Sequence, residues 1–261
     1  MPELVIASDQ ADARAAEAVL QHHAAMAGVL QVRTEELVAA ASRGDHAAAE
    51  RAQGELSRWC ATELVPHARA EEDTLYPVAG RTVEGRLLVE GMLGEHAVIV
   101  GLVEELTAAT DPVRAASAAR ALLAVFEAHV AKENDQILPL LVGLPGTSVA
   151  ELLEGMHALL GEGPAESQPA AGCGGHTCTC AADDPAGHPE LDARSIPHAI
   201  RHATIFGALE AVGPGAGLVL IAPHDPLPLL AQVEDRWPGT FAVEYLDRGP
   251  ESWRLAFTRP A

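Results

Sequence analysis

Two stretches of the chain repeat one pattern of metal-binding residue types. Residues 67–77 read HARAEEDTLYP and residues 129–139 read HVAKENDQILP, so His, Glu, Asp and Pro coincide at offsets 0, 4, 6 and 10. A second matching pair precedes them, HAAMAGVL at residues 23–30 and HAVIVGLV at residues 96–103. The order His, then His-x-x-x-Glu, therefore occurs twice. This duplication predicts two similar helical hairpins.

Capping and breaking residues divide the first 160 residues into helices. The sequence predicts long helices over about 9–42, 45–75, 82–109 and 111–139, with Pro77 and Pro139 ending the second and the fourth. Short connections make consecutive helices antiparallel, so we expect an all-α, up-down-up-down four-helix bundle. A short fifth helix is expected over about 148–160, which completes a domain spanning residues 1–160.

The remainder of the chain has a different composition. Residues 161–189 are rich in Gly, Ala, Pro and Cys, which predicts a flexible linker. Residues 190–261 predict a small α+β domain, with strands over about 218–222, 241–246 and 253–257 and helices over about 199–211 and 228–236.

Composition excludes some classes of function. A net charge of −20 argues against nucleic-acid binding, which needs clustered Lys and Arg. No apolar run reaches the roughly 18 residues of a membrane span, and the first ten residues do not resemble a signal peptide. Three of the four cysteines fall within eight residues, so no disulfide framework is expected. These features favour a cytoplasmic protein.

The spacing of the repeated residues indicates a metal site. Residues four apart on a helix share a face, so His67 with Glu71, and His129 with Glu133, can each present an imidazole and a carboxylate to one ion. His23 and His96 lie among apolar, core-facing positions. Buried imidazoles and carboxylates are costly unless they are paired or coordinated. Two bridged metal ions would satisfy all six groups, and the ligand set suits iron and manganese, with zinc possible.

Residues 10–160 resemble the hemerythrin-like, HHE cation-binding family, in the order of the His and His-x-x-x-Glu motifs and in the LYP and ILP helix ends. The resemblance implies two iron ions bridged by Glu71 and Glu133. It also implies four terminal ligands, which are His23, His67, His96 and His129. His22 is an alternative to His23, and Glu63, one turn before His67, is a candidate additional ligand.

One departure from the family pattern bears on function. Oxygen-carrying hemerythrins have a further histidine one turn after the third-helix ligand, where this chain has Val100. His22 or water would then fill the place, which leaves a position open to O₂, NO or peroxide. The first hypothesis is a binding or sensing protein. The alternatives are a di-iron oxidoreductase consuming peroxide or NO, an iron donor in iron–sulfur repair, and a structural metal-binding bundle.

Several other residues have weaker readings. The linker holds a thiol-rich patch, which comprises Cys173, His176, Cys178 and Cys180. The C-terminal region holds three histidines that can form a second metal or anion site, which are His198, His202 and His224. Cys60 and Tyr76 are expected to be packing residues, and the pair formed by His46 and Glu50 is expected to be exposed.

The C-terminal region also resembles a TusA/SirA-like family of uncharacterised proteins. The resemblance rests on LDAR at residues 191–194, HDP at 224–226 and WRL at 253–255. TusA-type sulfur carriers have a catalytic Cys near the start of the first helix. Residues 196–199 read IPHA, so sulfur relay is not expected.

Overall fold

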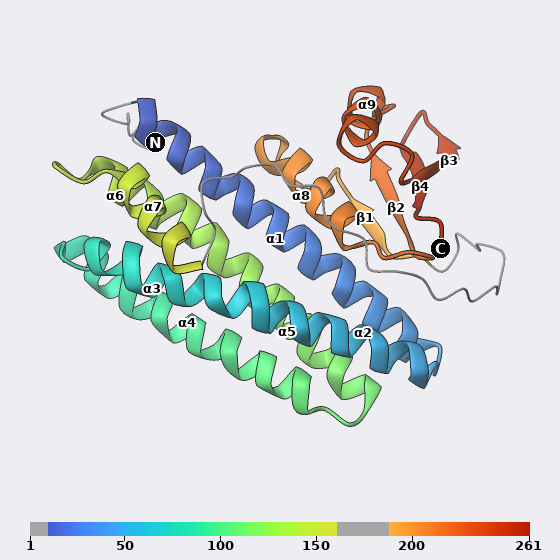
Figure 1. Ribbon diagram of the computed structural model, residues 1–261, viewed down its shortest axis with the longest axis horizontal. Helices are drawn as coiled ribbons and strands as arrows, with labels where there is room; N and C mark the ends of the chain where they lie inside the picture. The colour runs from blue at the N-terminus through green and yellow to red at the C-terminus, as the bar shows by residue number, and fades with distance from the viewer. Residues whose placement is uncertain (1–9, 161–187) are drawn as a thin grey trace. The chain divides into compact units, whose positions relative to one another are not determined.

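The computed structural model describes residues 10–160 and 188–261. Four consecutive helical segments alternate in direction and form the predicted four-helix bundle (Figure 1). The bounds of the helical elements are α1 Gln10–Ser42, α2 His46–Trp59, η1 Cys60–Leu64, α3 Val65–Ala79, α4 Val83–Ala108, α5 Pro112–Lys132, η2 Glu133–Ile137, α6 Leu138–Gly143 and α7 Val149–Leu160. Here η1 and η2 are π-helical turns within otherwise continuous segments.

Side-chain caps fix where three of these helices begin. Asp45 accepts a 3.0 Å hydrogen bond from the Ala48 amide at the start of α2. Thr82 Oγ1 accepts one of 2.8 Å from the Gly85 amide, and Asp111 caps α5 in the same way. Such caps satisfy amide groups that have no partner within the helix. The starts predicted from these capping residues are confirmed.

The predicted ends at Pro77 and Pro139 are wrong. The second segment continues through Pro77 to Ala79, and Pro139 lies in the first turn of α6. A proline lacks an amide hydrogen, which costs little in a first helical turn, where that hydrogen has no acceptor. The π-helical turn η2 shifts the hydrogen-bond register just before Pro139 and so places the proline in such a turn. Pro77 removes one helical hydrogen bond in the last turn of α3, and the helix ends two residues later.

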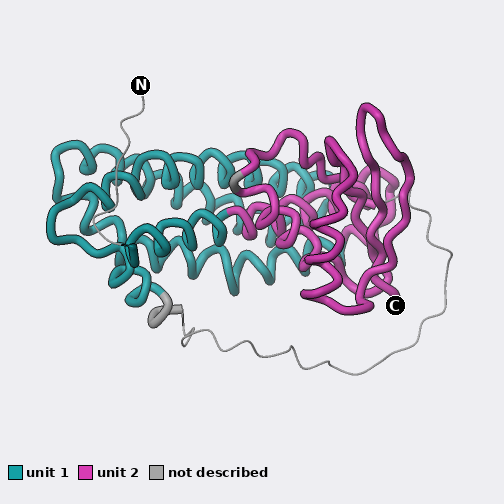
Figure 2. Tube along the Cα trace, turned by 90° about the horizontal axis from the view of Figure 1, so that it is seen from above, with its two compact units in different colours: residues 1–23, 50–166 teal, residues 24–49, 167–261 magenta. Residues whose placement is uncertain are grey.

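The described residues form two compact units that do not follow the order of the chain (Figure 2). Unit 1 comprises residues 10–23 and 50–160, and unit 2 comprises residues 24–49 and 188–261. Helix α1 is therefore shared, with its first half in unit 1 and its second half in unit 2. None of the described helices is long and apolar enough to span a bilayer.

Unit 2 contains a four-stranded mixed sheet in the order β1-β2-β4-β3. Strands β1 (Glu190–Asp192) and β2 (Gly217–Ala222) are parallel. Strands β3 (Ala242–Arg248) and β4 (Trp253–Thr258) continue the sheet in antiparallel pairs. The three predicted strands and two predicted helices, α8 (His198–Ala211) and α9 (Leu227–Arg236), are confirmed. Strand β1 was not predicted, because three residues are too few to show an alternating pattern.

Two glycines allow α1 and α8 to approach closely within unit 2. A Cβ atom on Gly207 of α8 would lie 2.1 Å from the carbonyl oxygen of Ala25, and one on Gly28 of α1 would lie 2.1 Å from that of Thr204. No Cβ atom can approach another atom this closely, so the backbones of α1 and α8 are in direct contact at these two glycines. Val32 of α1 is fully buried in the same core as residues of the sheet and of α8. The second half of α1 is thus part of the core of unit 2.

Candidate metal centre

The six residues predicted to converge do converge in one buried cluster in unit 1. None of them is more than 4% exposed. They come from four helical segments: His23 from α1, His67 and Glu71 from α3, His96 from α4, His129 from α5, and Glu133 from the first position of η2. Each His-x-x-x-Glu pair presents both groups from one face of its helix, as the four-residue spacing requires.

Glu71 lies at the middle of the cluster. Two groups of potential ligand atoms each fall within 4.8 Å of one another: the first is His23, His67 and Glu71, and the second is Glu71, His96 and His129. Glu71 Oε1 is 3.0 Å from His67 Nε2 and 3.2 Å from His23 Nε2, whereas Oε2 is 3.6 Å from His96 Nε2. The two oxygens of one carboxylate therefore face different histidine pairs, which is the arrangement of a bridging ligand.

Glu133 faces both groups as well. Its Oε2 atom lies 3.7 Å from His23 Nε2 and 3.6 Å from His129 Nε2. Among the described residues this buried oxygen has no hydrogen-bond partner. A buried, unpaired carboxylate oxygen is costly unless a cation compensates it. The donor set therefore fits a second bridging carboxylate.

The histidine nitrogens also fit coordination. His96 Nε2 and His129 Nε2 lie 3.0 Å apart. Two nitrogens each about 2.1 Å from one metal ion and at right angles to each other would be separated by about 3.0 Å. A cavity of about 10 Å³ lies among these side chains, bounded by apolar walls that include Leu64, Ile99 and Phe126. The space suits an ion or one water molecule rather than an organic ligand.

The electrostatics of the cluster reflect four imidazoles and two carboxylates buried close together. Burial lowers the pKa of His23, but the hydrogen bond to Glu71 and the charges of Glu133 and Glu71 outweigh it and raise the pKa to about 9. Burial, together with the charge of Glu71, raises the pKa of Glu133 to about 8. Burial and the neighbouring His96 lower the pKa of His129 to about 4. Protons on His23 and Glu133 thus balance charge where cations would otherwise do so.

Three of the four histidines are held through the ring nitrogen that points away from the centre. His23 Nδ1 lies 2.9 Å from Asn134 Oδ1, His96 Nδ1 lies 2.8 Å from Glu72 Oε1, and His129 Nδ1 lies 3.1 Å from Glu95 Oε2. Because these oxygens accept, each Nδ1 is the donor of its hydrogen bond, which leaves Nε2 as the atom that would coordinate a metal ion. The Nδ1 atom of His67 has no hydrogen-bond partner among the described residues.

Tyr76 belongs to the site, which corrects the expectation that it serves only in packing. Its side chain is 2% exposed, and its hydroxyl donates a 2.6 Å hydrogen bond to Glu133 Oε1. The hydroxyl oxygen of Tyr76 also lies 3.3 Å from His96 Nε2 and 3.4 Å from His129 Nε2. Burial and the charge of Glu133 raise the pKa of this phenol. The one available signal was that the repeats differ here, with Tyr in the first and Leu138 in the second.

The less certain ligand candidates lie outside both groups. His22 is exposed, with its ring centroid 4.9 Å from that of His67, whereas His23 is buried and faces the cluster. Glu63 is exposed, so it does not join the cluster. His46 and Glu50 are exposed, as predicted, and Cys60 is buried in η1.

The weaker second site gains no support from the structure. His202 and His224 are exposed, and neither belongs to a group of potential metal ligands among the described residues. His198 is likewise exposed and belongs to no such group among the described residues, whereas Cys173, His176, Cys178 and Cys180 lie outside those residues.

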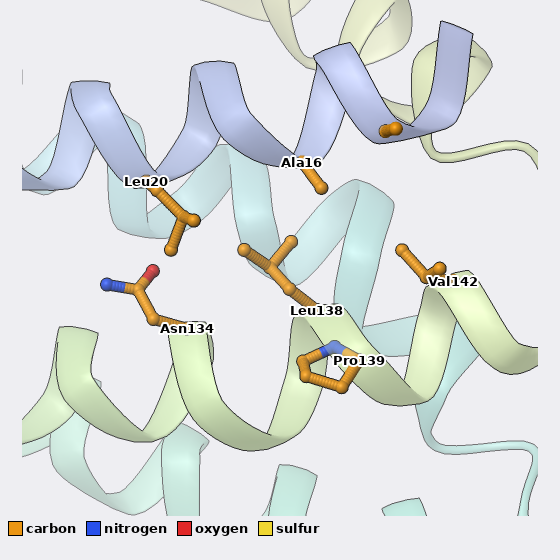
Figure 3. A pocket seen from close by; sticks show the side chains of 7 residues that line it. Ala16, Leu20, Asn134, Leu138, Pro139 and Val142 are labelled. Carbon is orange, nitrogen blue, oxygen red and sulfur yellow. The ribbon is translucent and has the colours of Figure 1, made fainter. Parts of the chain in front are cut away.

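An apolar cavity of about 300 Å³ lies beside the cluster, between the first half of α1 and the segment formed by η2 and α6. Figure 3 shows Leu20 and the amide of Asn134 at one end of it and Val142 at the other. Asn134 is also the hydrogen-bond partner of His23. One residue therefore links this cavity to the first histidine of the cluster.

Comparisons with known proteins agree with this geometry. Residues 14–141 match the hemerythrin HHE cation binding domain. Residues 190–259 match an uncharacterized conserved protein family, DUF2249. No curated protein and no solved structure matches the chain. The chain therefore combines a hemerythrin HHE cation-binding domain with a DUF2249 domain.

Proposed function

We propose that this protein binds two iron ions in the cluster of unit 1 and uses them to bind or sense a small oxidant, which is O₂, NO or peroxide. The observation that carries the proposal is the position of Glu71, whose two oxygens face separate pairs of histidines. His23 with His67 would hold one ion and His96 with His129 the other, and Glu71 and Glu133 would bridge them. Imidazole and carboxylate together suit iron, with manganese and zinc as competitors.

The bound metal would supply Lewis acidity and a redox-active position. The chain supplies the surroundings. Apolar walls separate the cluster from bulk water, and Val100 occupies the sequence position at which oxygen-carrying hemerythrins have a further histidine. The Tyr76 hydroxyl donates a 2.6 Å hydrogen bond to Glu133 Oε1, and the apolar cavity ending at Asn134 suits small uncharged molecules.

Tyr76 also favours a second candidate, an oxidoreductase that consumes peroxide or NO at the same centre. Reduction of either molecule by an external electron donor takes up protons, and the Tyr76 hydroxyl is a hydrogen-bond donor within the buried cluster. Reversible uptake of O₂ by the reduced protein, without turnover, supports binding or sensing. Sustained consumption of H₂O₂ or NO supports the oxidoreductase instead.

The metal content of the purified protein tests the proposal directly. We expect about two iron ions per chain and charge-transfer absorption in the near ultraviolet. Two zinc ions and no iron would leave only a structural metal-binding bundle. Glu133→Ala should lose most of the metal, whereas Glu90→Ala, an exposed glutamate on α4, should retain it. Unchanged metal content in Glu133→Ala would contradict the bridging role.

A further inference from the structure

One half of the cluster contains His96 and His129, and the other contains His23 and His67. The two halves differ in the groups that contact the Nδ1 atoms of these histidines. His96 and His129 each direct Nδ1 at a carboxylate, at 2.8 Å to Glu72 and 3.1 Å to Glu95. In the other half, His23 directs Nδ1 at the neutral amide of Asn134. His67 Nδ1 has no hydrogen-bond partner among the described residues. In the aligned repeats Glu72 corresponds to Asn134 and Glu95 to His22, and the structure shows which histidines the residues at these positions contact.

A carboxylate that accepts a hydrogen bond from Nδ1 makes the imidazole a stronger metal ligand. The negative charge draws the Nδ1 proton toward itself and increases electron density at Nε2, and such partners typically change metal affinity by about 10–100-fold. A neutral amide orients the ring but adds no charge. Two more negative charges near one half also attract a cation through simple Coulomb interaction.

We propose that the centre fills in a fixed order, with the ion held by His96 and His129 bound first and more tightly than the ion held by His23 and His67. Glu72 and Glu95 are the positioning residues that create this difference. The inference deepens the proposed function and rests on it, since it concerns the same metal centre. Its consequence is one firmly held ion beside one that exchanges more readily.

Glu72 and Glu95 should differ in how strongly they affect metal affinity, because their surroundings differ. Lys132 forms an ion pair with Glu95 and shares its charge. Among the described residues, Glu72 pairs with no lysine or arginine. Replacement of Glu72 by Gln should therefore weaken binding more than the same change at Glu95. Both carboxylates are partly exposed, so glutamine can replace them without disturbing the buried core.

The test is a titration of metal-free full-length protein with Co²⁺ alone, monitored by visible absorption, which reports coordination at each step. We expect two steps in the wild-type protein, the first at least 10-fold tighter. Glu72→Gln and Glu95→Gln should weaken the first step by about 10-fold or more and leave the second within about 3-fold. Asp73→Asn and Glu90→Gln are the matched controls, because each removes an exposed carboxylate on the same two helices. Both controls should titrate like the wild type.

Single-ligand variants assign the steps to the two halves. His67→Ala should keep one Co²⁺ at the affinity of the first step, and His129→Ala should lose that step. Two equal steps in the wild type, or a retained tight step in His129→Ala, would overturn the inference while leaving the proposed function intact. A second step weakened as much as the first by Glu72→Gln would overturn it as well. No Co²⁺ binding by the wild-type protein would overturn the proposed function itself.

Discussion

Tyr76 donates a hydrogen bond to Glu133 across the bundle, from the last turns of α3 to the first residue of η2, at 2.6 Å. The bond joins the two halves of the sequence repeat at the centre of the cluster. It satisfies one oxygen of a buried carboxylate and leaves the other, Oε2, facing His23 and His129. A residue outside the repeated pattern therefore orients one of the two proposed bridging ligands.

Removal of this hydroxyl should destabilise the metal-free protein. In Tyr76→Phe a buried oxygen of Glu133 loses its donor, which costs about 1–3 kcal/mol of unfolding free energy. Urea unfolding of the chelated protein measures the change. Tyr245→Phe is the control, because its hydroxyl bonds Asp225 at a more exposed place in unit 2 and should cost no more than about 1 kcal/mol. Equal losses in the two variants would contradict a special role for Tyr76.

The stability of the metal-free protein should fall as pH rises above neutral. The folded pKa values of His23, about 9, and Glu133, about 8, both exceed their ordinary values of 6.5 and 4.5. Each proton therefore stabilises the fold fully below the ordinary pKa, and that contribution is lost as pH rises through the folded pKa. We expect a lower urea midpoint at pH 9.5 than at pH 6.5 for the chelated protein.

Metal binding at pH 7 should release protons, because cations take the place of the protons on His23 and Glu133. Calorimetric titration with Zn²⁺ in buffers of different ionisation enthalpy counts the protons released. The stabilisation conferred by Zn²⁺ should also grow between pH 6.5 and pH 9. A binding enthalpy that is the same in every buffer would contradict this picture of a protonated cluster.

The neighbouring histidines of α1 should differ in their importance for the metal. His23 is buried and lies 3.2 Å from Glu71, whereas His22 is exposed. We expect His23→Ala to lose at least one metal ion per chain and His22→Ala to retain both, as measured by elemental analysis. Metal loss in His22→Ala alone would reverse the assignment of the α1 ligand.

The close approach of α1 and α8 should tolerate no side chain. Gly207→Ala would place Cβ against the backbone of Ala25 and should cost about 1–3 kcal/mol or more through overpacking. Gly213→Ala is the matched control, because its Cβ would meet nothing within 4 Å, and its effect should stay within about ±0.5 kcal/mol. Thermal unfolding of both variants gives the comparison, and equal midpoints would argue against the contact.

The helical bundle could be predicted because its signals are local. Asp45 and Asp111 cap helices by contacts two or three residues away, and the His-x-x-x-Glu pairs share a helix face through the pitch of the helix alone. The duplicated motif also identified the six residues that converge. The helix ends at Pro77 and Pro139 were predicted wrongly, because a π-helical turn and the position within the last turn decide whether a proline is tolerated.

The sequence by itself therefore determined the helices, the repeat and the chemistry of the six converging side chains, since each depends on neighbours along one helix. Only the tertiary structure decided that Tyr76 reaches Glu133, that Glu95 stands behind His129 while Asn134 stands behind His23, and that Gly207 meets α1. These contacts join residues dozens to more than a hundred positions apart. Their partners are set by how the helices pack, which no local spacing encodes.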